Sequence, residues 1–214
     1  MNLLQRHDEW VADRVGKITA SRVKDISAKP RKGKVLNATM TTLLTERLTG
    51  EIEYRRISDA MQWGIDNEPN AIAAYENITS QFVVGCGLIP HPTISMSGAS
   101  PDGLIGKDGL IEVKCPNRDT HTNTILTQQV PDEYLPQIIW QLACTGRQWC
   151  DFVSYDPRFR EDLRTVIIRV HVEDVDIETI ENDVAACNAK LNQIIENLTK
   201  TKEGETLCAE LIKQ

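Results

Sequence analysis

The sequence predicts an α/β fold in which helices flank a central mixed β-sheet. Helix-like and strand-like segments alternate along the chain, which is typical of that class. Residues 148–156 and 163–172 are rich in β-branched and aromatic residues and read as strands. Residues 175–198 carry apolar side chains at steps of three and four, which indicates a long amphipathic helix that covers the sheet.

Length and composition predict a single domain over residues 1–214. The chain has 41% apolar and 26% charged residues, and it is long enough for one sizeable core but short for two. The sequence contains no internal repeats and no linker long enough to separate domains. Within the single domain we expect N-terminal helices with a basic loop (1–50), a core (60–172) and a C-terminal helix with a tail (173–214).

The sequence predicts neither a membrane span, nor a signal peptide, nor disulfides. No run of apolar residues is long enough to span a bilayer, and the charged N-terminus predicts no signal peptide. The six cysteines have no CxxC or zinc-type spacing, so we expect reduced thiols rather than disulfides.

Helices dominate the expected N-terminal part. Residues 9–16 predict a short helix that ends at Gly16, and residues 18–27 a second one capped by Thr19 or Ser21. Residues 28–34 form a basic loop. Residues 38–50 then predict a helix that Gly50 ends.

The middle of the chain predicts one helix and one hairpin. Residues 67–77 have an apolar helical face, with Pro69 near the expected helix start. Residues 100–106 and 109–115 are short apolar runs bounded by glycines, which predicts a β-hairpin. Residues 131–146 follow as a helix, with Pro136 in its first turn and a glycine at its end.

Charge is distributed unevenly. The net charge is −7, yet residues 14–34 contain eight basic residues and one acidic residue, a local net charge of +7. A basic patch on an acidic body can hold a polyanion locally, although a solvated lysine-rich loop has the same composition. The basic residues are Arg14, Lys17, Arg22, Lys24, Lys29, Arg31, Lys32 and Lys34.

The hairpin carries the most informative chemistry. Asp102 precedes one strand, and Glu112 and Lys114 share one face of the other, while Ile111 and Val113 face the core. Two converging carboxylates in a partly dry cleft are costly unless a divalent ion neutralises them, and oxygen ligands suit Mg²⁺ or Mn²⁺. A surface hairpin with an Asp–Lys or Glu–Lys pair is the alternative.

The same residues resemble the PD-(D/E)xK nuclease superfamily, whose core is restriction-endonuclease-like. Pro101-Asp102 and Glu112-Val113-Lys114 are the matching motif. Flanking stretches, "EWVADRVGKITASRV", "WGIDNEPNAIAAYE" and "LPQIIWQLACTGRQWCDFVSYDPR", are similar to the phage lambda exonuclease and YqaJ-type viral recombinase family. The resemblance runs in order from about residue 9 to residue 173.

The resemblance implies roles for individual residues. Asp102, Glu112, the Val113 carbonyl and, through water, Glu68 match the metal ligands, Lys114 the catalytic lysine, and Gln137 a glutamine that faces the site. Arg14, Ser21 and Ser100 match the positions that bind a terminal 5′-phosphate. Arg31, with Lys32 and Lys34 beside it, matches the region that follows the DNA backbone. Taken alone, Glu68 would be a dipole-favoured helix N-terminal residue, Gln137 a surface amide and Arg14 a surface ion-pair partner.

The family further implies an activity and an assembly. It implies a 5′→3′ exonuclease that uses two Mg²⁺ ions (with Mn²⁺ as a substitute) and digests one strand of linear duplex DNA from 5′-phosphorylated ends. A ring-shaped homotrimer, a single-strand annealing protein as partner and a cytoplasmic location in a bacterial host are also implied. A restriction-type or structure-specific endonuclease of the same fold is the main alternative, and a DNA-end-binding module without catalysis is another.

Overall fold

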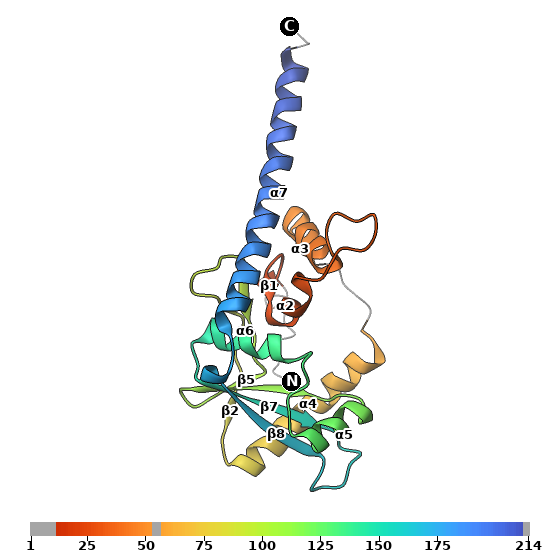
Figure 1. The fold of residues 1–214 in the computed structure, drawn as a ribbon, viewed down its shortest axis with the longest axis vertical. Coiled ribbons are helices and arrows are strands. Elements are labelled where there is room, and N and C mark those ends of the chain that lie inside the picture. Colours follow the sequence, from red (N-terminus) through yellow and green to blue (C-terminus); the bar gives the residue numbers. More distant parts are fainter. Residues whose placement is uncertain (1–11, 53–56, 212–214) are drawn as a thin grey trace.

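The structure, a computed structural model, describes residues 12–52 and 57–211, with side chains described as far as residue 200 (Figure 1). Residues 9–11 of the expected helix over residues 9–16 lie outside the described residues, whereas residues 13–16 are in turns and Gly16 has a left-handed φ of +66°. The elements in chain order are β1 (Ile18–Thr19), α2 (Ala20–Ile26), α3 (Ala38–Thr49), α4 (Asp59–Thr79), β2 (Val83–Val84), β3 (Ile89–Pro90), β4 (Ser97–Ala99), β5 (Gly103–Ile105), β6 (Gly109–Lys114), α5 (Arg118–Thr127), α6 (Leu135–Thr145), β7 (Trp149–Tyr155), β8 (Thr165–His171), a 3₁₀ turn (Val172–Asp174) and α7 (Ile177–Leu211).

A five-stranded sheet of order β2-β5-β6-β7-β8 forms the centre of the molecule. Strands β6 and β7 are parallel, whereas the other neighbours are antiparallel, so the predicted mixed sheet is confirmed. The predicted hairpin is β5–β6, and its register pairs Ile105 with Gly109 across the turn. A small sheet of order β1-β4-β3 lies beside the main one.

The two faces of β6 pack against different helices. Ile111 and Val113 are buried in a cluster that contains Tyr75 of α4. Leu110, on the other face, packs in a cluster with Ile138 of α6. Because side chains alternate along a strand, Glu112 points the same way as Leu110, toward α6. Helices on both faces thus enclose the acidic residue that the hairpin carries.

The long helix α7 packs mainly on other helices rather than on the sheet, which corrects the sequence prediction. Its Leu191 belongs to a buried cluster with Leu43 of α3 and Trp140 of α6. Only the start of the helix, at Ile177, packs against the cluster on the sheet face. Figure 1 shows the C-terminal part of α7 extending away from the rest of the molecule. This cluster therefore contains residues from all three parts of the chain, 1–50, 60–172 and 173–214.

Helix α4 begins earlier than predicted. Ser58 caps it by accepting a hydrogen bond from the Met61 amide at 3.2 Å, so Pro69 lies inside the helix instead of at its start. Pro69 lacks an N–H and cannot donate to the preceding turn. The side-chain amide of Asn67 donates to the Trp63 carbonyl at 2.8 Å in this region. The predicted helix start was wrong because it relied on Pro69, whereas the N-cap, Ser58, lies eleven residues before that proline.

The other expected elements are confirmed. Helix α2 follows Thr19, although no side-chain bond caps it, and Gly50 and Gly146 end α3 and α6 in the left-handed conformation. Two histidines, His91 and His121, are buried. Cys86, Cys115, Cys144, Cys150 and Cys187 are free thiols. Across the described residues, no helix combines the length and apolarity needed to cross a bilayer.

Candidate active site

A pocket of about 410 Å³ is lined by the three charged residues of the hairpin motif, Asp102, Glu112 and Lys114. It lies where α4, the β5–β6 hairpin and the start of α6 meet. Six of the predicted site residues line it, namely Glu68, Asp102, Glu112, Val113, Lys114 and Gln137. The convergence of these residues is the central finding about the site, because they come from positions up to 69 residues apart in the sequence.

Asp102 sits in the turn before β5 and is held by the neighbouring strand. Its Oδ2 accepts a hydrogen bond from the Val113 amide at 2.7 Å. Burial, then the carboxylate of Glu112, raises the pKa of Asp102 well above its usual range, and Glu68 acts in the same direction. Lys114 and the Val113 amide oppose this shift. Asp102 is thus a half-buried acid close to two further carboxylates, an arrangement typical of cation sites.

Glu112 is 1% exposed and is bonded on both oxygens. Gln137 Nε2 donates to its Oε1 at 2.6 Å, and Gln141 Nε2 donates to its Oε2 at 2.5 Å. Both glutamines lie on α6, one helical turn apart, so they present amides to the same carboxylate. The sequence reading found Gln137 but missed Gln141, which the i+4 spacing could have indicated.

Lys114 forms an ion pair with Glu112 on the same strand. Burial opposes its charged form, but the carboxylates of Glu112 and Asp102 outweigh that effect and raise the pKa of Lys114. Its Nζ also lies 5.4 Å from the ring centroid of Tyr134. Glu112 is buried and the pair borders a pocket, so the alternative of a solvated surface hairpin is wrong.

Glu68 lies in the middle of α4, which rules out its interpretation as a helix N-terminal residue. It reaches the pocket beside Cys115. Burial, then the carboxylates of Glu68 and Asp102, raises the pKa of the Cys115 thiol to about 12. Cys115 is therefore a neutral thiol at physiological pH and is not an activated nucleophile.

The donor set of the pocket fits a divalent cation. Three carboxylates, those of Glu68, Asp102 and Glu112, line it, and its lining contains no histidine. Such oxygen donors suit Mg²⁺ or Mn²⁺ rather than zinc. No group of three His, Cys, Asp or Glu side chains in the described part is already gathered in ligand geometry. Binding an ion would therefore replace some of the hydrogen bonds that now engage Glu112.

The residues expected to bind a 5′-phosphate, Arg14, Ser21 and Ser100, do not line this pocket. Strands β1 and β4 are parallel, with Thr19 opposite Gly98, so Ser21 and Ser100 each lie two residues beyond this paired position. The buried Ser100 hydroxyl has no hydrogen-bond partner among the described residues. Burial, aided by Arg22, lowers the pKa of Arg14 to about 10, and a nearby anion would favour its charged form.

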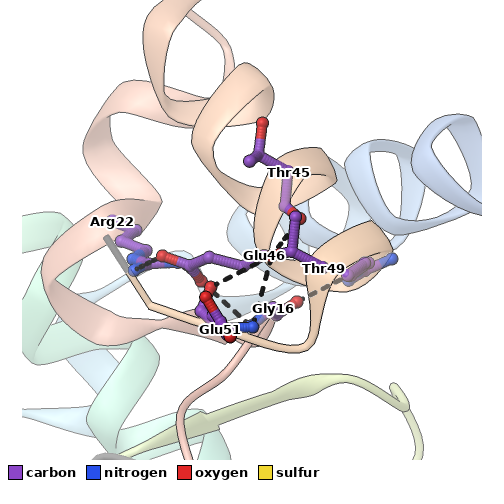
Figure 2. A network of polar contacts seen from close by, with 7 residues as sticks. Gly16, Arg22, Thr45, Glu46, Thr49 and Glu51 are labelled. Atoms are coloured by element: carbon purple, nitrogen blue, oxygen red, sulfur yellow. Dashed lines mark hydrogen bonds and ion pairs between the residues drawn. The ribbon is translucent and has the colours of Figure 1, made fainter. Parts of the chain in front are cut away.

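The Arg14–Ser21 segment is fastened to α3 by a buried acid, as Figure 2 shows. Glu46 is 1% exposed and accepts hydrogen bonds from the Gly16 amide at 2.9 Å and from both terminal nitrogens of Arg22 at 2.8 and 2.7 Å. Arg47 Nε donates to the Gly16 carbonyl at 2.8 Å. A Cβ at position 16 would lie 2.5 Å from Arg47 Cγ, and φ there is +66°, so glycine is required.

The residues expected to contact the DNA backbone are exposed and lie apart from the pocket. Arg31, Lys32 and Lys34 belong to the loop between α2 and α3. Arg31 and Lys34 border a separate cavity of about 330 Å³. Arg22, counted earlier among the basic residues, is paired with Glu46 and contributes less free positive charge than the sequence suggested.

Comparison with known proteins gives the family. The model of the YqaJ-like viral recombinase domain matches residues 9–148. The chain belongs to this family. The crystal structure of LHK-Exo, an alkaline exonuclease from Laribacter hongkongensis, is 46% identical with a TM-score of 0.84, and the match covers 92% of this chain and 99% of that one. LHK-Exo in complex with dAMP matches at the same identity and coverage, with a TM-score of 0.85.

A more distant structure shares the fold of this YqaJ-like chain. The phage-related exonuclease from Haemophilus somnus 129PT is 14% identical, with a TM-score of 0.65 over 85% of this chain and 96% of that one. No curated protein matches the chain in sequence. The family and the fold implied by the sequence motifs are thus confirmed.

Proposed function

We propose that this YqaJ-like protein is a Mg²⁺-dependent DNA exonuclease that digests one strand of linear duplex in the 5′→3′ direction. The observation that carries the proposal is the pocket in which Asp102, Glu112 and Lys114 meet. The nuclease motif matches these positions, and the similar solved structures are described as exonucleases. Digestion that leaves 3′ overhangs would serve recombination by single-strand annealing in a bacterial cytoplasm.

In the proposed mechanism Asp102, Glu112 and the Val113 carbonyl hold the metal ions, and Glu68 contributes through water. The bound ions would polarise the phosphodiester and lower the pKa of the attacking water. Lys114 places its ammonium group beside the reacting phosphate and stabilises developing negative charge. Gln137 and Gln141 keep the Glu112 carboxylate in a fixed orientation through the two bonds from α6.

The direct test is digestion of linear duplex labelled at one terminus or the other. We expect Mg²⁺-dependent release of label from the 5′ end first, and Mn²⁺ in place of Mg²⁺ should support the reaction. Covalently closed circular duplex should stay intact, and its cleavage would instead identify an endonuclease. If neither ion supports digestion, the protein would instead be a DNA-end-binding module without catalytic activity. Sedimentation of the full chain tests the proposed homotrimer, which a monomer at working concentration would contradict.

Replacing Arg14 by alanine should remove the preference for phosphorylated 5′ ends. A charge-assisted hydrogen bond contributes about 1.5–3 kcal/mol, so the parental preference should fall by roughly 10- to 150-fold. The measurement is the ratio of initial rates on 5′-phosphate and 5′-hydroxyl duplexes. Lys190→Ala, which removes an exposed positive charge on α7, serves as control and should keep the parental ratio. An unchanged ratio in Arg14→Ala would contradict the phosphate-binding role.

Salt should weaken binding to DNA ends steeply, because each phosphate contact releases counterions. With about four contacts, from Arg14 and the three loop cations, the slope of log K against log salt is about −3.6. Changing Arg31, Lys32 and Lys34 together to alanine should make that slope shallower by about 2.7. Titrations by fluorescence anisotropy without divalent ions measure both slopes. Equal slopes would show that the loop does not contact DNA.

A further inference from the structure

A second cavity, of about 470 Å³, adjoins the catalytic pocket. The two share five lining residues, among them Met61, Cys115 and Tyr134. The second cavity also has walls of its own, formed by Trp63 of α4 and by Arg158 in the loop after β7. Any ligand in this cavity therefore lies directly beside the carboxylates of the active site, and no residue of the catalytic motif belongs to its separate part.

Trp63 and Arg158 form a rigid stack. The guanidinium carbon of Arg158 lies 4.4 Å from the ring centroid of Trp63. Asp156, which is fully buried, accepts hydrogen bonds from Arg158 Nε at 2.7 Å, from Nη2 at 2.5 Å and from the backbone amide at 3.0 Å. These bonds hold the guanidinium plane in one orientation. The Arg158 side chain is nevertheless 35% exposed and borders the cavity.

Charge in the cavity favours a flat neutral group over a phosphate. The positive charge of Arg158 is balanced by Asp156, and the Glu133 carboxylate also lines the wall. No net positive charge therefore remains from these three groups to attract a phosphate. A guanidinium plane already stacked on an aromatic ring is, however, a surface on which nucleobases stack in nucleic-acid-binding proteins.

Packing alone does not account for this arrangement. The indole N–H of Trp63 is buried and has no acceptor among the described residues. Leaving a buried donor unpaired costs free energy, and a phenylalanine at this position would not incur that cost. A tryptophan is better explained by the large planar surface that it supplies beneath Arg158.

We propose that the Trp63–Arg158 stack is a binding platform for one nucleobase of the strand that enters the catalytic pocket. The base lies against the guanidinium plane while its 5′-phosphate reaches toward the carboxylates next door. The identity of the strand rests on the proposed exonuclease function, whereas the base-binding site itself does not. Because stacking accepts every base, the platform orients the nucleotide without selecting sequence.

The test compares two probes that differ by the base, dAMP and 2-deoxyribose 5-phosphate. Calorimetric titration of the full chain should show dAMP binding roughly 5- to 150-fold tighter, the range for one stacked base. Arg158→Lys keeps the positive charge beside Asp156 but removes the planar guanidinium. The ratio of the affinities for dAMP and the sugar phosphate should therefore fall toward one, while the affinity for the sugar phosphate changes little. Arg160→Lys, at an exposed position paired with Asp162 in the same loop, is the matched control and should keep the preference.

Two results would overturn the platform. One is parental protein that binds both probes equally or binds neither, a comparison that requires no variant. The other is a folded Arg158→Lys variant that keeps the parental preference. Digestion of linear duplex, run on the same preparations, separates this inference from the proposed function. Digestion without a base preference refutes the platform alone, and a base preference without digestion refutes the exonuclease alone.

Discussion

Lys114→Ala is expected to slow DNA digestion by about 10²- to 10³-fold, the effect of removing one preorganised charge from a reacting centre. The ammonium pairs with Glu112 at the edge of the pocket, where two carboxylates outweigh the opposing effect of burial and stabilise its charged form. Alanine removes this positive charge from beside the phosphate and leaves the stabilisation of negative charge there to bound metal ions. Single-turnover digestion of linear duplex at saturating Mg²⁺ measures the loss.

The control for this variant lies on the same hairpin. Lys107 is exposed in the turn between β5 and β6 and does not line the pocket, so Lys107→Ala should digest DNA at the parental rate. End binding measured without divalent ions should be similar for the parental chain and both variants. Turnover by Lys114→Ala at the parental rate would refute the catalytic assignment, and a loss of end binding would show that Lys114 acts earlier, in binding.

The parts of the site that depend on short-range order were predictable. Alternation along β6 placed Glu112 and Lys114 on one face and Val113 on the other, and the glycines at 106 and 109 marked the turn. The end of α6 followed from Gly146 in the same way. In each case the information lies within about ten residues, which is the range over which backbone geometry dictates side-chain direction.

The parts that depend on contacts between distant segments were not predictable. Gln141 lies at i+4 from Gln137, but that spacing does not identify its partner, an acid 29 residues away. The buried His121 donates from Nε2 to the Leu163 carbonyl, and its Nδ1 is hydrogen-bonded to the Ser154 hydroxyl, partners 42 and 33 residues away. Most polar side chains are exposed, and one is buried only where the fold supplies hydrogen-bond partners, which can come from distant parts of the sequence.

Glu46→Ala is expected to destabilise the protein by about 3 kcal/mol, at the lower end of the range for breaking a buried ion pair. The change leaves the Gly16 amide and both terminal nitrogens of Arg22 without their shared acceptor. The lower end applies because the Arg22 side chain is 23% exposed and water can solvate part of it. For a chain of this size the melting temperature should fall by roughly 6–12 °C.

Thermal and urea unfolding measure this loss, with Glu51→Ala as the matched control. Glu51 lies just beyond the end of α3 in an exposed position, so its removal should change stability by no more than about 0.5 kcal/mol. Arg22→Ala combined with Glu46→Ala completes a double-mutant cycle. Because the two side chains share hydrogen bonds, the double variant should lose less stability than the sum of the single losses. Additive losses would mean that the pair seen in Figure 2 does not stabilise the fold, and that the Arg14–Ser21 segment is held in place by packing instead.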